Sequence, residues 1–174
     1  ILIVYFSFSG NNRLLAEHLA KRINCDAFPI VEKKRRTIIT ILLDMLFRRE
    51  PKIEDLECAA SNYDRIVLVA PIWDSKLANP IKTFIKKEKA ALSDYSFISL
   101  CGYERSGQKE SITQELLAFT SRAPKAVYEL RISDLFPAVK RNEIRIIARY
   151  HITEKDLIIF EPQINEFLKL IQSQ

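Results

Sequence analysis

Three short apolar segments place the strongest constraint on how this chain can fold. Residues 1–6, 66–72 and 97–101 are rich in Ile, Val, Leu and Phe, and they do not alternate cleanly with polar residues. Strands that are covered on both faces have this pattern, because neither side of their sheet meets water. The segments therefore predict the central strands of a parallel sheet with helices on both sides.

Two further segments have the features of edge strands. Residues 25–31 contain Pro29, which has no N–H group to donate to a neighbouring strand. Residues 127–132 alternate, and Glu129 and Arg131 are expected to face water. In chain order the strands are thus central, edge, central, central and edge. This pattern fits a three-layer α/β/α fold, doubly wound around a five-stranded parallel sheet in the order 2-1-3-4-5.

Helical periodicity fills the gaps between these strands. Residues 11–23, 108–121 and 162–172 repeat apolar residues three or four positions apart. A further helix is expected to follow Asn79 as its N-cap, with Pro80 as the first helical residue.

Two segments are less clearly defined. Residues 33–50 are apolar between basic ends, and we expect a buried helix there; a helix that lies on a membrane surface is the alternative. Residues 133–160 form an irregular connection that the pattern does not place. No repeat or low-complexity segment divides the chain, so residues 1–174 are expected to form a single domain.

Composition limits the cellular compartment of the protein and the kinds of binding site that it can form. No apolar run approaches the roughly 20 residues that span a bilayer, and the first residues lack the basic part of a signal peptide. Cys25, Cys58 and Cys101 have no close partner in sequence, which indicates a reducing, cytoplasmic setting. The two histidines lie far apart, so a metal site is not expected. Nucleic-acid binding is not expected either, because no aromatic platform accompanies the basic residues.

All three glycines follow predicted central strands. Gly10 comes after the first strand, and Gly102 and Gly107 come after residues 97–101. Ligands of open parallel sheets bind beyond the carboxyl ends of the strands, at the point where the strand order reverses. These loops therefore predict a ligand site, although glycines also gather in loops for conformational reasons alone.

The first loop has the composition of a phosphate site. It contains Ser7, Ser9, Gly10, Asn11 and Asn12, directly before a predicted helix. The hydroxyls, the side-chain amides and the free N–H groups at the start of the helix are expected to donate hydrogen bonds to a phosphate, aided by the helix dipole. The loop is neither a Walker A motif nor a dinucleotide-binding glycine motif.

Three loops together resemble those of the flavodoxin-like family of FMN proteins. The stretch "SFSGNN" at 7–12 is similar to the family's phosphate loop, with Asn12 in place of a threonine. The stretch at 70–85 is similar to a loop that contacts the flavin ring, and the stretch at 100–112 to a loop that closes over it. The basic, apolar segment before the third strand is similar to that of an uncharacterised bacterial subgroup. By this resemblance the ring would be held by Pro71, Ile72, Trp73, Asp74, Ser75, Cys101, Gly102, Tyr103 and Gly107.

The resemblance implies FMN as the cofactor and a redox function. The chain would be an electron carrier, or a small flavin oxidoreductase that uses NAD(P)H or a quinone. The alternative is a flavodoxin-fold interaction module that no longer binds flavin, which Asn12, Asp74 and the charged pair at 104–105 motivate. No side chain is expected to act as a catalytic acid or base, and Cys101 is expected to be an inert thiol. The redox partner, whether a protein or a small-molecule electron donor or acceptor, is left open; the net charge of +5 argues against an ordinary acidic shuttle.

Overall fold

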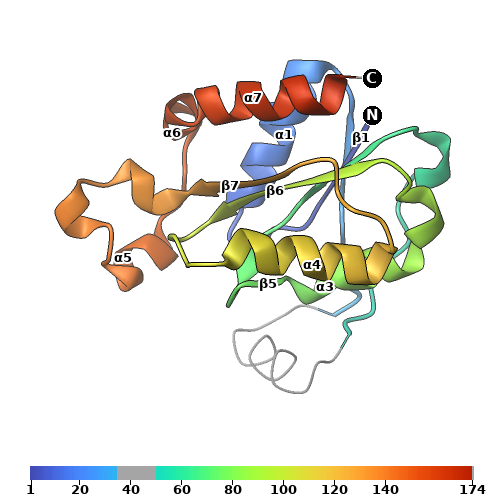
Figure 1. Ribbon diagram of the computed structural model, residues 1–174, viewed down its shortest axis with the longest axis horizontal. Helices are drawn as coiled ribbons and strands as arrows, with labels where there is room; N and C mark the ends of the chain where they lie inside the picture. The colour runs from blue at the N-terminus through green and yellow to red at the C-terminus, as the bar shows by residue number, and fades with distance from the viewer. Residues whose placement is uncertain (35–49, 174) are drawn as a thin grey trace.

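A five-stranded parallel sheet lies at the centre of the molecule, and its strands follow the order β2-β1-β3-β6-β7 (Figure 1). Counted along the chain, this is the predicted order 2-1-3-4-5, which is confirmed. The computed structural model describes residues 1–34 and 50–173. The strands are β1 (Leu2–Tyr5), β2 (Asp26–Pro29), β3 (Ile66–Val69), β6 (Tyr95–Cys101) and β7 (Val127–Arg131).

Different helices cover the two faces of the sheet. Leu2 and Val4 belong to one buried core and Ile3 to the other, because successive side chains of a strand point to opposite faces. Helices α3 and α4 cover the first core, and α1 and α7 cover the second (Figure 1). The three layers of the predicted fold are thus present. The helix bounds are Asn11–Ile23 for α1, Asn79–Lys87 for α3, Gln108–Thr120 for α4 and Glu161–Gln172 for α7.

The third predicted strand is shorter than expected, because residues 66–72 divide between two elements. Strand β3 ends at Val69, and a separate antiparallel hairpin follows, formed by β4 (Ile72–Trp73) and β5 (Lys76–Leu77). Pro71 lies at the break, where it has no N–H group to continue a ladder. The break turns the chain away from the sheet and directs the hairpin toward the loops of the neighbouring strands.

Both predicted edge strands lie at the edges of the sheet, but two local predictions were wrong. Glu129 does not face water: it is half-buried, because α4 packs against the face of β7 on which it lies. Asn79 is not the N-cap of α3. Ala78 has that position, and its carbonyl accepts hydrogen bonds from the N–H groups of Ile81 and Lys82. The helix therefore begins at Asn79, and Pro80 is its second residue.

The connection after β7 is irregular, as expected, and it contains two short helices, α5 (Ile144–Arg149) and α6 (Glu154–Ile159). The helix predicted at 33–50 falls largely on residues outside the described part of the chain. Within residues 1–34 and 50–173, no helix is long and apolar enough to cross a membrane. Single 3₁₀ turns complete the fold at Ala60–Asn62, Lys89–Ala91, Ile132–Leu135 and Ala138–Lys140.

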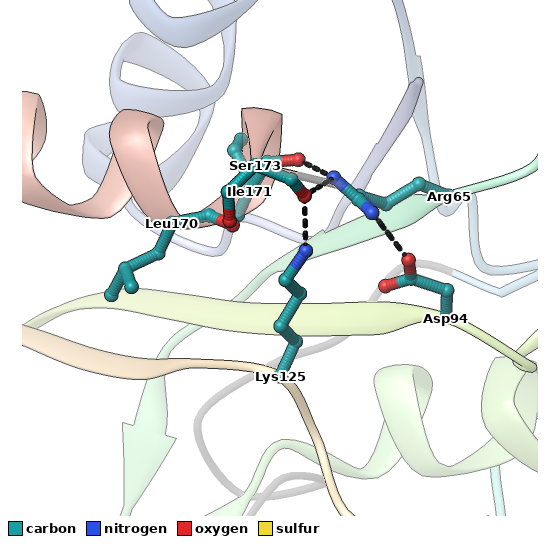
Figure 2. Close-up of polar contacts among 6 residues, drawn as sticks. All are labelled: Arg65, Asp94, Lys125, Leu170, Ile171 and Ser173. Atoms are coloured by element: carbon teal, nitrogen blue, oxygen red, sulfur yellow. Dashed lines mark hydrogen bonds and ion pairs between the residues drawn. The ribbon is translucent and has the colours of Figure 1, made fainter.

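The end of α7 is fixed at the amino edge of the sheet (Figure 2). Arg65 precedes β3, and its Nε donates to Oδ2 of Asp94 at 2.8 Å. The same guanidinium donates to the carbonyls of Ile171 and Ser173, and Nζ of Lys125 also donates to the carbonyl of Ser173. Two cations thus complement the negative end of the helix dipole. This contact lies at the edge opposite to the glycine-containing loops.

Candidate functional site

A cavity of about 430 Å³ lies at the carboxyl ends of β1, β3 and β6, between the loops that follow these strands. This is the switch point of the sheet, where β1 has β2 on one side and β3 on the other. Its volume lies in the range typical of small-molecule sites, roughly 300–1,000 Å³. The cavity brings together most of the predicted site residues: Ser9, Asn11, Asn12, Pro71, Ile72, Trp73, Asp74, Cys101, Gly102 and Tyr103.

The remaining predicted residues lie outside this cavity. Ser7 and Gly10 line a second hollow of about 500 Å³ on the other side of the first loop, and Ser9 borders both hollows. Ser75 lies in the turn of the β4–β5 hairpin, and Gly107 is the N-cap of α4 with a φ of 71°. The first loop therefore separates two spaces, and only one of them is shared with the other two loops.

The backbone of the first loop is arranged to donate hydrogen bonds. Gly10 is the N-cap of α1 with a φ of 97°, a conformation that favours glycine, and its N–H donates to Oγ of Ser7 at 3.1 Å. Within the described chain, the backbone N–H groups of Ser9, Asn11 and Asn12 donate to no other protein group. The first N–H groups of a helix have no partner inside the helix, and they attract anions together with the helix dipole. This donor set fits a phosphate group.

The side chains of the two asparagines differ from the prediction that they donate to a phosphate. Asn12 is buried, its Nδ2 donates to the carbonyl of Leu100 at 3.1 Å, and its Oδ1 accepts from the N–H of Leu100 at 2.9 Å. Asn11 is also buried, its Nδ2 donates to the carbonyl of Tyr150 at 2.9 Å, and its Oδ1 accepts from the N–H of Ile152 at 3.1 Å. Each amide therefore bonds to another backbone segment at two points. These side chains position the loop, and its backbone N–H groups are the free donors.

Aromatic side chains form one wall of the cavity. The ring of Trp73 lies edge-to-face against Phe6, with centroids 5.9 Å apart, and against Phe8, with centroids 6.5 Å apart. Phe8 also lines the cavity and is 48% exposed. Tyr103 lines the cavity from the loop after β6. Phe8 was not predicted as a site residue, although an aromatic residue between the two serines of a candidate phosphate loop is a visible signal.

The second and third loops are tied together at the cavity. The hairpin turn at Asp74 and Ser75 has φ values of 50° and 57°, as a type I′ hairpin turn requires. Arg105, from the third loop, forms an ion pair with Asp74, and its Nη2 donates to the hydroxyl of Tyr103 at 2.8 Å. Ser111 Oγ donates to the carbonyl of Ser75 at 3.0 Å. Asp74 therefore has a cation beside it, and the hairpin is fixed to α4.

The segment after β7 covers part of the cavity, which the sequence did not predict. Ile147 and Ala148 of α5 line it, and Cγ2 of Ile147 lies 3.6 Å from the position that a Cβ atom on Gly102 would take. Nδ1 of His151 donates to the carbonyl of Ser9 at 3.1 Å. No regular pattern marks residues 133–160, so only the short apolar run around Ile147 signalled a buried contact.

The described residues offer little acid–base chemistry at the cavity. Burial raises the pKa of the Cys101 thiol to about 12, so the thiol stays protonated at neutral pH. Within residues 1–34 and 50–173, no group of His, Cys, Asp and Glu side chains is arranged to hold a metal ion. The arrangement can bind and enclose a ligand with an anionic end and a flat apolar part.

No protein-family model matches the chain, and no curated protein matches it in sequence. Among solved structures, it is similar to a flavoprotein from Lactobacillus acidophilus in complex with FMN, with 19% identity over 74% of this chain and 91% of that one, and a TM-score of 0.61. It is also similar to a protein from Bacteroides eggerthii assigned as a flavoprotein, with 18% identity over 99% of this chain and 98% of that one, and a TM-score of 0.71. A protein from Bacteroides uniformis with the same assignment has 16% identity over 86% of this chain and 97% of that one, and a TM-score of 0.63. The chain therefore has the flavodoxin-like fold found in these flavoproteins.

Proposed function

We propose that this protein binds FMN in the 430 Å³ cavity and functions as a flavin-dependent electron-transfer protein in the cytoplasm. One observation carries the proposal: the cavity at the switch point joins free backbone donors of the first loop to aromatic walls from the other loops. A phosphate fits the donors, and a flat heteroaromatic ring fits the walls. The similarity in fold to a flavoprotein crystallised with FMN supports this assignment.

The phosphate would be held mainly by the backbone. The N–H groups of Ser9, Asn11 and Asn12 donate, and the hydroxyl of Ser9 adds a further donor, whereas Ser7 lines the second hollow. These are neutral groups, so the helix dipole of α1 supplies most of the local positive potential. The loop keeps its shape because the asparagine side chains fix it to two other segments.

The ring would lie among the second and third loops. Trp73 and Tyr103 supply aromatic surface, which contributes on the order of 1 kcal/mol per contact beyond the burial of area. The ion pair of Asp74 with Arg105 keeps the two loops together, and Ile147 closes part of the space and excludes water. FMN, when bound, supplies the redox chemistry, and the protein positions it and tunes its environment.

An FMN titration followed by flavin fluorescence tests this function. We expect stoichiometric quenching by the wild-type protein at micromolar concentrations. Riboflavin, which lacks the phosphate, is expected to bind about tenfold or more weakly, because it leaves the donors of the first loop unpaired. A Trp73→Leu variant is expected to weaken the binding of both ligands by a similar factor. Absence of quenching by FMN would contradict the proposal and favour a flavin-free interaction module.

Stopped-flow mixing separates a carrier from an enzyme. NADH, NADPH or a reduced quinone is mixed with the FMN-loaded protein, and the flavin absorbance is followed. We expect slow reduction by all three, because the loops around the cavity carry no visible nicotinamide-binding motif. Fast, saturable reduction by one of them would instead assign the chain to the small flavin oxidoreductases.

A further inference from the structure

The segment at 137–149 exposes apolar side chains next to the cavity. Every residue from 137 to 146 is exposed, and Val139, Ile144 and Ile146 are 86%, 56% and 43% exposed. In Figure 1 this segment, with α5, extends away from the sheet at one side of the molecule. Exposed aliphatic residues with polar neighbours, all within one short segment, favour a protein-binding surface.

The same segment carries an excess of positive charge. Lys140, Arg141, Arg145 and Arg149 are accompanied by a single carboxylate, Glu143. Among the described residues none of these four cations forms an ion pair. The contrast with the rest of the surface is clear, since many other described cations pair with carboxylates. Unpaired charges of one sign favour and steer a partner of the opposite sign.

The position of the segment connects it to the proposed FMN site. Ile147 and Ala148 line the cavity, so the exposed segment runs directly into one wall of it. Phe8 also lines the cavity and is 48% exposed, which adds apolar surface there. A protein bound to the segment would therefore lie next to the ring of a bound flavin.

We propose that residues 137–149 dock an acidic protein that carries one electron at a time. The aliphatic residues contact an apolar centre on the partner, and the four cations contact its surrounding carboxylates. The inference rests on the proposed function, because the flavin gives the partner its reason to dock here. In each encounter one electron passes from the reduced carrier protein to the flavin. The carrier is oxidised and the flavin is reduced by one electron, and no covalent bond forms or breaks.

The test is a calorimetric binding titration with an acidic plant-type [2Fe–2S] ferredoxin, on both flavin-free and FMN-loaded protein. The charge variant is Lys140→Glu/Arg145→Glu. Its control is Lys21→Glu/Lys169→Glu, which changes the charge equally at exposed positions on α1 and α7. An apolar variant, Val139→Ser/Ile144→Ser, alters side chains that contribute nothing to the buried cores. Circular dichroism verifies that each variant is folded.

We expect the wild-type protein to bind the ferredoxin, with an affinity that falls as salt is added. The charge variant should bind about tenfold or more weakly, the apolar variant about three- to tenfold more weakly with an unchanged salt dependence, and the control within about twofold of wild type. Absence of wild-type binding, or equal losses in the charge variant and its control, would overturn the proposal.

Two further outcomes are distinguishable. Vesicles of phosphatidylcholine with phosphatidylserine are tested in parallel by co-sedimentation. Loss of vesicle binding in the charge variant, with ferredoxin binding unchanged, would make the segment a membrane-surface site and overturn the proposal. If ferredoxin binds as expected but FMN does not bind, the docking surface stands and the proposed function alone fails.

Discussion

At the scale of single residues, Asn11 and Asn12 join the first loop to the rest of the site. Their type and place were evident in the sequence, but their bonding partners, Leu100, Tyr150 and Ile152, lie about 90 to 140 positions away. A side-chain amide presents a donor and an acceptor side by side, so it can bond to a backbone segment as a neighbouring strand would. Composition therefore predicted a polar loop correctly, while the direction of each amide depended on long-range contacts.

Replacement of Asn12 by aspartate is expected to destabilise the fold. In Asn12→Asp a carboxylate oxygen replaces Nδ2 and faces the carbonyl of Leu100 at a buried position. Because the two acceptors repel and the charge is poorly hydrated, the free energy of unfolding should fall by about 2–4 kcal/mol. Urea denaturation measures this. Asn142→Asp, at an exposed position, is the control and should change stability by less than about 0.5 kcal/mol. Equal effects of the two substitutions would show that the Asn12 side chain does not hold the first loop against Leu100.

Glu129 is predicted to make the stability depend on pH. It lies opposite Ser99 in the sheet, and Oε1 of Glu129, Oγ of Ser99 and Nε2 of Gln108 are buried without a hydrogen-bond partner among the described residues. Burial is the largest effect and raises the pKa of Glu129 above the ordinary 4.5, although the nearby Gln108 side chain and then Arg131 and Lys109 oppose the rise. The folded state therefore retains the proton where the unfolded state has lost it. This contribution to stability is complete below pH 4.5 and is lost as the pH rises through the folded-state pKa.

The variant Glu129→Gln tests this pH dependence. We expect it to be more stable than wild type at pH 7, by about 1 kcal/mol, with a difference that shrinks toward pH 4. Urea denaturation between pH 4 and pH 7 measures the difference. Glu54→Gln, a change of equal charge at an exposed position, serves as the control. A stability difference for Glu129→Gln that is constant over this range would show that the carboxyl group does not titrate differently on folding.

At the scale of elements, local patterns predicted the regular segments, and tertiary contacts determined the exceptions. Apolar runs predicted β1 and β6, and helical periodicity predicted α1, α4 and α7 to within a residue or two at their ends. Residues 66–72 formed one apolar run, yet Pro71 divides it into a strand and a hairpin. Helix α5 escaped prediction because it is less than two turns long, and because exposed Ile144 and Ile146 beside Arg145 and Arg149 obscure the periodicity that would mark its buried face.

The C-terminal end of α7 should depend on Arg65 more than on Lys125 (Figure 2). In Arg65→Leu, Asp94 loses its cation, and its Oδ1 is already buried without a partner among the described residues. We expect the free energy of unfolding to fall by about 2–3 kcal/mol and hydrogen exchange to accelerate in the last turn of α7. Lys125→Met, an exposed contact, should cost less than about 1 kcal/mol. The reverse ranking would contradict this assignment.

At the scale of the whole molecule, topology determines where a ligand site can form. The alternation of strands and helices predicted the sheet order, and this order places the loops after β1, β3 and β6 around one cavity. The cover of the cavity could not be predicted in the same way. Ile147 lines it next to Gly102, and the 150–152 segment is bound to Asn11, which lines it as well; both contacts join distant parts of the chain. Rules of connectivity thus located the site, and side-chain packing completed it.

FMN should stabilise the whole fold, because it binds elements that are far apart in the sequence. At a concentration one hundred times the dissociation constant, the linkage relation gives about 2.7 kcal/mol of added stability. For a chain of this size that corresponds to a rise in Tm of about 5–10 °C. Differential scanning calorimetry measures the shift, and riboflavin at the same concentration should give a clearly smaller one. Equal shifts would mean that the donors of the first loop do not bind the phosphate.

Which segments FMN stabilises is a stricter test of the proposed site than how much it stabilises the whole fold. The Asn11 side chain is bonded to the backbone of Tyr150 and Ile152. This clamp is expected to transmit any ordering of the first loop to residues 147–152, which cover part of the cavity. Hydrogen exchange on FMN addition should therefore slow at 147–152 as well as in the three loops, while the contacts of Arg65 at the opposite edge change little. In Asn11→Ala the loops should still be protected and the 147–152 segment should lose its response. Protection of that segment in Asn11→Ala would show that the ligand, and not the clamp, orders the cover.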